Sequence, residues 1–86
     1  MAASVTLYTT RFCPYCIRAK QLLQEKDADY EELAVDENPA LRAKMIELSG
    51  RHTVPQIWIG EHHVGGFDDL WFLEQRGQLD RLLNAA

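Results

Sequence analysis

The cysteine pair Cys13 and Cys16 stands directly behind a run of strand-forming residues, and this arrangement limits the possible folds more than any other feature. The run Val5–Thr9 is rich in β-branched and aromatic side chains, which favour a strand. Pro14 suits the first position of a helix, where a missing N–H costs nothing. The chain is therefore predicted to open with a strand, a turn and a helix that starts at the cysteines.

The next segment repeats the alternation of strand and helix. A second strand is predicted from Tyr30 to Val35. Asn38-Pro39 reads as a helix cap followed by proline at the first helical position, and Gly50 ends the helix. A strand, a helix and a strand in succession imply a parallel pair in one sheet.

A β-hairpin is predicted further along. Gln56–Ile59 and His62–Val64 flank Gly60-Glu61, which fits a two-residue turn with glycine at its first central position. The two strands are therefore expected to be antiparallel.

Two short helices are predicted to close the chain. Asp68-Asp69 stand where a helix cap belongs, residues 70–76 follow, Gly77 interrupts, and residues 79–83 form a final amphipathic helix. The order βαβαββα plus a short C-terminal helix predicts an α/β fold, a mixed four-stranded sheet flanked by helices. A single domain is expected over 1–86.

Charge and hydropathy exclude several kinds of partner. The formal net charge of −4 repels nucleic acid and anionic membranes. The start of the chain lacks the apolar run of a secretory signal, and 18 apolar residues never run together. We expect no nucleic-acid or membrane partner, and a cytoplasmic location.

The spacing of the cysteines favours redox chemistry over a structural role. A disulfide across two intervening residues removes little entropy from the unfolded chain, so it would be a poor staple. The start of a helix favours a thiolate at Cys13, and Arg11 is close enough to help. The apolar positions Ala19 and Leu23 turn Cys16 towards the core. Cys13 is predicted to attack a disulfide and Cys16 to resolve the mixed disulfide.

Two other readings of the cysteines remain open. They could simply pack, or they could bind zinc together with His62 and His63. Adjacent residues of a strand point to opposite faces, which argues against two imidazoles on one metal, so no metal site is expected. Trp58 is expected to pack from its strand.

The sequence resembles the small dithiol class of the glutaredoxin family nearly from end to end. The resemblance rests on four segments taken in order: Leu7-Tyr8-Thr9 leading to Cys13-Pro14-Tyr15-Cys16, then Ser49 to Ile59, then Val64 to Asp69, and Gly77-Gln78-Leu79. It implies a thioredoxin-like fold and reduction of disulfide-containing or glutathionylated proteins with glutathione as co-substrate. No tightly bound cofactor is expected, and the protein is expected to be a monomer.

The resemblance also implies where glutathione binds. Val54-Pro55 is expected to be a cis peptide beside Cys13, with the Val54 backbone pairing with the cysteinyl part of glutathione like an added strand. The family commonly has a lysine where this chain has Thr10, so Arg11 or Arg51 is expected to supply the charge for the glycyl carboxylate. The expected contact residues are Arg11, Tyr15, Arg51, Thr53, Val54, Pro55, Gly66, Phe67, Asp68 and Asp69.

Three functions of other classes compete with this reading. A thioredoxin would usually carry Gly-Pro between its cysteines. An iron–sulfur carrier would bridge two chains through Cys13, and a binding module would leave both thiols idle.

Trp71 is expected to pack in an apolar stretch of helix.

Overall fold

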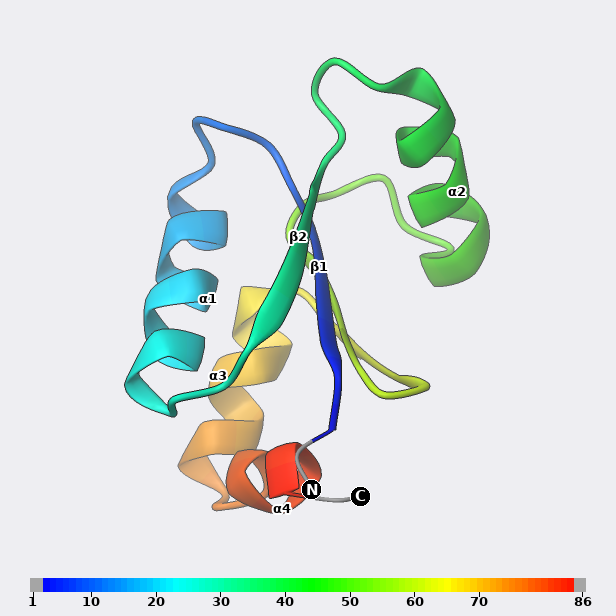
Figure 1. The fold of residues 1–86 in the computed structure, drawn as a ribbon. Helices are drawn as coiled ribbons and strands as arrows, with labels where there is room; N and C mark the ends of the chain where they lie inside the picture. Colours follow the sequence, from blue (N-terminus) through cyan, green and yellow to red (C-terminus); the bar gives the residue numbers. More distant parts are fainter. Residues whose placement is uncertain (1–2, 85–86) are drawn as a thin grey trace.

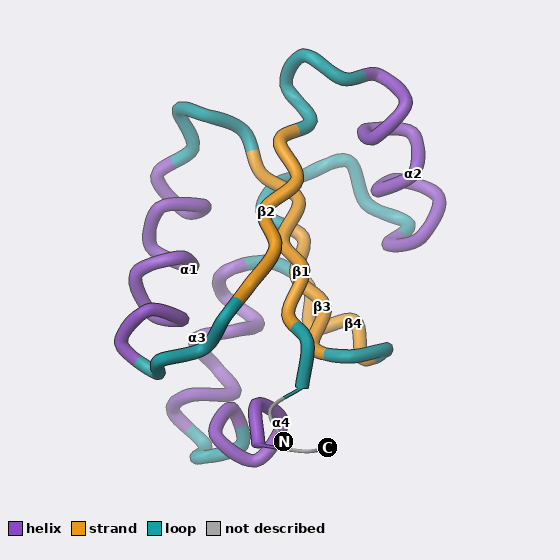
Figure 2. The backbone as a smooth tube through the Cα atoms, viewed as in Figure 1, coloured by secondary structure: helices purple, strands orange, loops and turns teal. Residues whose placement is uncertain are grey.

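The structure, a computed structural model, describes residues 3–84 and follows the predicted order of elements (Figures 1 and 2). The elements are β1 (Val5–Thr9), α1 (Pro14–Glu25), β2 (Tyr30–Ala34), α2 (Pro39–Ser49), β3 (Gln56–Ile59), β4 (His62–Gly65), α3 (Phe67–Gln75) and α4 (Leu79–Asn84).

The four strands form one sheet in the order β2-β1-β3-β4. β1 pairs in parallel with β2 and antiparallel with β3, and β3 and β4 form the predicted hairpin. The turn of this hairpin places Gly60 at φ 60°, a backbone conformation in which glycine is favoured. The expectation of a mixed four-stranded sheet is confirmed.

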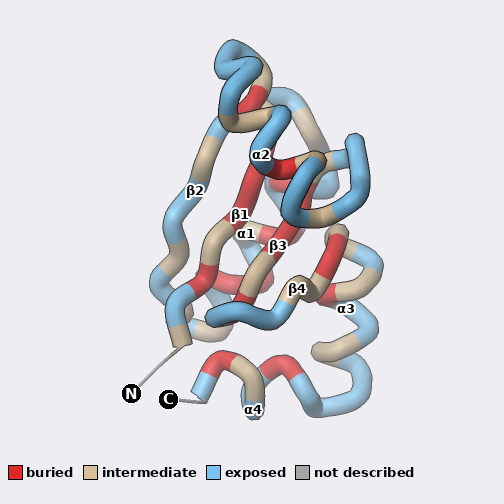
Figure 3. The backbone as a smooth tube through the Cα atoms, turned by 90° about the vertical axis from the view of Figure 1, so that its right-hand side faces the viewer, coloured by how far each residue is buried: buried red, intermediate tan, exposed pale blue. Residues whose placement is uncertain are grey.

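Helices cover both faces of the sheet, with α1 and α3 on one side and α2 on the other (Figure 1). Leu7 and Ile57 pack with Leu23 of α1 and Leu70 of α3 in the larger core. Tyr8 and Val35 pack with Met45 of α2 in the smaller one. The buried stretches gather along β1 and β3, whereas β2 is largely exposed (Figure 3). The two central strands therefore anchor the loops at their ends.

The predicted start and end of α2 are confirmed. The Leu41 N–H donates to Asn38 Oδ1 at 3.1 Å, which satisfies one of the free donors of the first turn. Gly50 ends the helix in the left-handed conformation at φ 71°.

The predicted start of α3 is wrong. The helix begins at Phe67 with Gly66 as its N-cap, so Asp68 and Asp69 lie inside the first turn and do not precede it. The Gly66 N–H donates to Asp69 Oδ2 at 2.9 Å, a bond from the third helical residue back to the cap. The other boundaries differ by one residue: β2 ends at Ala34.

Within residues 3–84, none of the helices has both the length and the apolar character needed to span a bilayer.

Candidate active site

Cys13 lies at the end of the loop that follows β1 and serves as the N-cap of α1. Its Sγ accepts a hydrogen bond from the Cys16 N–H at 3.3 Å, and its thiol donates to the Val54 carbonyl oxygen at 3.7 Å. The side chain is partly exposed, and the first turn of α1 contains no acidic residue. The start of α1 is therefore a position that favours negative charge, and Cys13 Sγ lies there within reach of a substrate.

Cys16 lies one turn further, fully buried against the core. Burial, and next the hydrogen bond with Cys13, raise the pKa of the Cys16 thiol to about 12. Cys16 therefore keeps its proton at neutral pH. The predicted contrast between an accessible thiol and a buried one is present in the structure.

A cleft of about 360 Å³ opens beside Cys13. It is formed by α1, by the loop between α2 and β3, and by the start of α3. Its lining contains nine of the ten residues expected to contact glutathione: Tyr15, Arg51, Thr53, Val54, Pro55, Gly66, Phe67, Asp68 and Asp69. Three segments far apart in the sequence thus meet at one surface.

The loop before β3 forms one wall of the cleft. The Val54-Pro55 peptide bond is cis, as the resemblance implies. Pro55 is buried and Val54 half-buried, and the Val54 carbonyl oxygen faces the thiol of Cys13.

An ion pair joins the loop before β3 to the first turn of α3. Arg51 Nη1 lies 3.1 Å from Asp69 Oδ2, which also accepts the Gly66 N–H. Partial burial opposes charge on Asp69, but the Gly66 N–H and the Arg51 guanidinium outweigh it and lower the pKa of this carboxyl group. The cleft therefore offers both a cation and an anion at this end.

Gly65 allows the ion pair to come close to β4. Its φ of 115° is strained for any side chain, and a Cβ there would overlap the carboxylate of Asp69 and crowd Arg51 Nη1. Glycine is therefore the residue that can adopt this backbone conformation and also leave room for the ion pair between Arg51 and Asp69.

Arg11 is the one predicted contact residue that the structure does not bring to the cleft. Its guanidinium forms ion pairs with Asp36 and Glu37, each at 2.8 Å. The hydrogen bond from Arg11 lowers the pKa of Asp36. Of the two arginines, Arg51 is the one that lines the cleft.

Sequence reasoning missed a row of aromatic rings beside the cleft. Trp71 is 47% exposed, so it packs against a neighbouring ring on the surface and not in the core. Its ring stacks on Phe67 at 6.3 Å between centroids, and Phe67 faces Tyr15 at 6.4 Å. The signal was the spacing of four residues between Phe67 and Trp71, which has meaning only when the helix includes Phe67.

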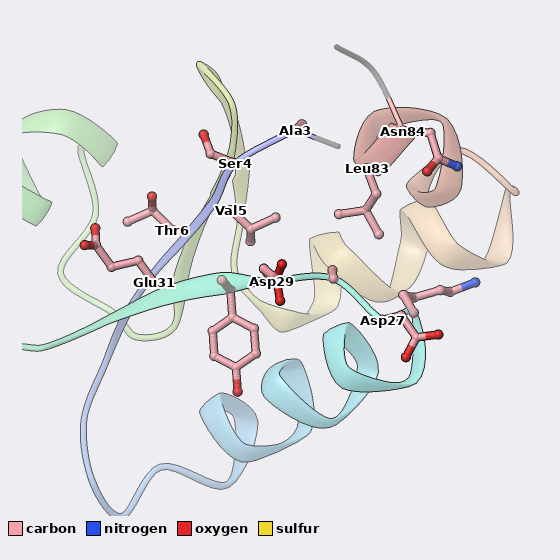
Figure 4. A pocket seen from close by; sticks show the side chains of 12 residues that line it. Ala3, Ser4, Val5, Thr6, Asp27, Asp29, Glu31, Leu83 and Asn84 are labelled. Atoms are coloured by element: carbon pink, nitrogen blue, oxygen red, sulfur yellow. The ribbon is translucent and has the colours of Figure 1, made fainter. Parts of the chain in front are cut away.

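A larger hollow of about 630 Å³ lies near the start of β1, at the end away from the cysteines (Figure 4). Charged side chains such as Asp27, Asp29 and Glu31 surround it, and it contains none of the predicted site residues. We therefore assign the chemistry to the smaller cleft, which adjoins a thiol.

The histidines of β4 do not gather around the cysteines. Among residues 3–84, no three His, Cys, Asp or Glu side chains are grouped so that they could hold a metal ion. The His63 Nε2 atom instead lies 2.8 Å from Gln56 Oε1.

Known proteins are similar to this chain in both sequence and fold. The family model named Glutaredoxin matches residues 5–64. A glutaredoxin of Pseudomonas aeruginosa is 62% identical over 81 residues, covering 94% of this chain and 96% of the relative. Glutaredoxin 3 of Escherichia coli K12 is 54% identical over 81 residues, covering 94% of this chain and 98% of the relative.

Solved structures of proteins with the same name have a fold similar to that of this chain. The solution structure of a glutaredoxin from Brucella melitensis superimposes with a TM-score of 0.86 at 53% identity, covering 96% of this chain and 90% of the other. The crystal structure of a buckwheat glutaredoxin–glutathione complex gives a TM-score of 0.86 at 29% identity, covering 92% and 74%.

Proposed function

The chain belongs to the glutaredoxin family of thiol–disulfide oxidoreductases, and we propose that it uses glutathione to reduce protein disulfides and glutathione mixed disulfides. The observation that carries the proposal is the cleft beside Cys13, which the Val54 backbone and an arginine–aspartate pair both line. These are the groups that a zwitterionic tripeptide with a central thiol requires. The related buckwheat protein was solved as a complex with glutathione.

Each part of glutathione has a matching group in the cleft. The cysteinyl backbone pairs with Val54, next to Cys13 Sγ. The γ-glutamyl carboxylate meets the N–H groups at the start of α3, and its ammonium meets Asp68, because Asp69 already pairs with Arg51. Arg51 supplies the cation for the glycyl carboxylate, in place of the lysine absent at Thr10.

The reaction with a glutathionylated protein needs only Cys13. Its thiolate attacks the glutathione sulfur, a bond forms between the two sulfur atoms, and the protein sulfur leaves as a thiolate that takes a proton from water. A second glutathione then attacks the glutathione sulfur held on Cys13, which releases oxidised glutathione and the Cys13 thiolate. Mixed disulfide and glutathione are thereby converted to free protein thiol and oxidised glutathione.

A protein disulfide needs Cys16 as well. Cys13 bonds to one substrate sulfur and the other leaves as a thiolate. Cys16 then attacks Cys13 Sγ and its proton passes to the substrate sulfur that leaves, which releases the second substrate thiol and leaves a disulfide between Cys13 and Cys16. Because burial raises the pKa of Cys16 to about 12, this thiol is protonated at neutral pH and does not compete with Cys13 for the substrate disulfide. Two glutathione molecules reduce the internal disulfide again.

The proposed partners are glutathione and the disulfide-containing or glutathionylated proteins that this protein reduces. The protein acts as a monomer in the cytosol, where the glutathione pool is reducing.

The test is NADPH consumption with hydroxyethyl disulfide, glutathione and glutathione reductase. We expect turnover that depends on glutathione. Turnover with thioredoxin reductase in the absence of glutathione would show a thioredoxin instead. A coloured protein after purification without oxygen would point to an iron–sulfur carrier, and no turnover with either donor would leave a binding module.

A further inference from the structure

The amide of Gln56 is fully buried at the first position of β3, directly after Pro55. A buried amide is costly unless its donors and its acceptor are satisfied. Gln56 meets this requirement through two neighbours, Thr53 and His63. One of them lines the cleft and the other lies on β4.

The chemistry of these contacts fixes the direction of each hydrogen bond. Gln56 Nε2 lies 3.0 Å from the Thr53 carbonyl oxygen and 3.2 Å from Thr53 Oγ1. A carbonyl oxygen only accepts, so the amide nitrogen must face Thr53. The amide oxygen then faces His63, 2.8 Å from Nε2, and His63 must carry its proton on Nε2.

His63 is itself held in place. Its ring stacks on Trp58 with 4.5 Å between centroids and 27° between planes. Trp58 packs edge-on against Tyr8 of β1, at 5.4 Å. The donor that orients Gln56 is therefore fixed to the sheet.

Thr53 and Val54 have less support of their own. Residues 51–55 belong to neither a helix nor a strand, yet Thr53 and Val54 line the cleft and the Val54 carbonyl oxygen faces Cys13 Sγ. The Gln56 amide donates hydrogen bonds to both the backbone carbonyl oxygen and the hydroxyl oxygen of Thr53.

We propose that Gln56, oriented by His63, is a positioning residue that holds Thr53 and Val54 in the conformation needed to bind the cysteinyl part of glutathione. The inference rests on the proposed function for its ligand. It adds a chain of contacts from β4 through the sheet to the cleft, although neither Gln56 nor His63 lines the cleft itself.

Three variants and a matched control separate this role from simple packing. Gln56→Leu keeps the size but removes the hydrogen bonds to Thr53 and His63. His63→Phe keeps the ring on Trp58 but removes the donor, and His63→Gln restores a donor. His62→Phe is the control, because His62 is the exposed neighbour on the same strand.

The first readout is the KM for a glutathionylated peptide, beside the kcat and the rate at which iodoacetamide alkylates Cys13. We expect Gln56→Leu and His63→Phe to raise the KM by about three- to tenfold, the effect of one hydrogen bond on an equilibrium. The kcat and the alkylation rate stay near wild type, since Cys13 is untouched, and His63→Gln recovers part of the KM. A uniform fall in kcat and alkylation rate, or a KM like that of His62→Phe, would overturn the proposal.

The second readout needs no glutathione. The backbone amide NMR signals of Thr53 and Val54 are expected to shift and broaden in Gln56→Leu and His63→Phe, and to stay unchanged in His62→Phe. A wild type without glutathione turnover contradicts the proposed function but leaves this readout intact. Unchanged signals in folded variants contradict the positioning role alone.

Discussion

Two helices begin at the same cleft, and their first turns are built in opposite ways. α1 starts with Cys13 as its N-cap and has no acidic residue in the first turn. α3 starts at Gly66 and has Asp68 and Asp69 in its first turn. A helix start attracts negative charge in both cases. In α3 the chain's own carboxylates supply that charge, whereas in α1 the attraction is left to the sulfur.

Because of this difference, the two ends of the cleft differ in how they hold negative charge. Negative charge at the α1 end can form on Cys13 and move to another sulfur during exchange. At the α3 end it is fixed on Asp69, which Arg51 and the Gly66 N–H hold in place. One end of the cleft is suited to reaction and the other to recognition.

The largest effect should come from removing the sulfur at the start of α1. Cys13→Ser is expected to abolish reduction of both glutathione mixed disulfides and protein disulfides, because no other accessible thiol lies at the cleft in the described part of the chain. Cys16→Ser should retain the first activity and lose the second. NADPH-coupled assays with each substrate measure this, and an equal loss in both variants would contradict the assigned roles.

The start of α3 can be broken at Gly65. Gly65→Ala forces a side chain into a positive φ and against Asp69, so we expect the free energy of unfolding to fall by about 3 kcal/mol. Gly77→Ala is the matched control, because Gly77 has a φ of 70° and open space around its Cα, and should cost about 1 kcal/mol. Urea unfolding of both variants gives the comparison. Equal losses would mean that the contact with Asp69 contributes nothing.

The contrast between the two helix starts can also be reduced by giving α1 an acid. Tyr15→Glu places a carboxylate in its first turn, next to the charge that Cys13 must carry. We expect iodoacetamide to alkylate Cys13 about two- to fivefold more slowly at neutral pH and low salt. Tyr15→Gln controls for the lost ring, and a similar slowing in that variant would rule out the charge as the cause.

The smallest effect concerns the charge already present on α3. Folding lowers the pKa of Asp69, so its charged form stabilises the fold above the unfolded pKa and loses this effect as the pH falls through the folded value. The pair with Arg51 is half-exposed, so only about 0.5 kcal/mol is expected. Between pH 7 and strong acid, the wild type should lose that much more unfolding free energy than Asp69→Asn. An equal loss in Asp69→Asn would contradict a contribution from this charge.

Much of the fold could be predicted because each element carries its own local signals. Asn38, Pro39 and Gly50 mark the ends of α2, and the turn at Gly60-Glu61 fixes the hairpin. The start of α3 could not be read in this way. Gly66 has no side chain to announce a cap, and two aspartates suit the cap and the first turn equally well.

The candidate site was predictable from the sequence wherever a motif carried it. The resemblance named ten contact residues, and the structure brings nine of them around one cleft. Arg11 instead pairs with Asp36 and Glu37, and the cause lies in the sheet. Asp36 and Glu37 follow β2, and only the parallel pairing of β1 with β2 brings them to Arg11. Gln56 and His63 lie seven residues apart on two strands, so their contact depends on the hairpin register.

The complete burial of Cys16 next to Cys13 offers a way to identify the proteins that react with Cys13. With glutathione absent, Cys16 is the thiol placed to release a protein bound to Cys13, because it lies one helical turn away and needs no approach from the solvent. A serine at position 16 would therefore turn a passing intermediate into a lasting covalent adduct, joined at a single known sulfur. Mass spectrometry of such adducts would identify the substrates directly, one linked cysteine at a time.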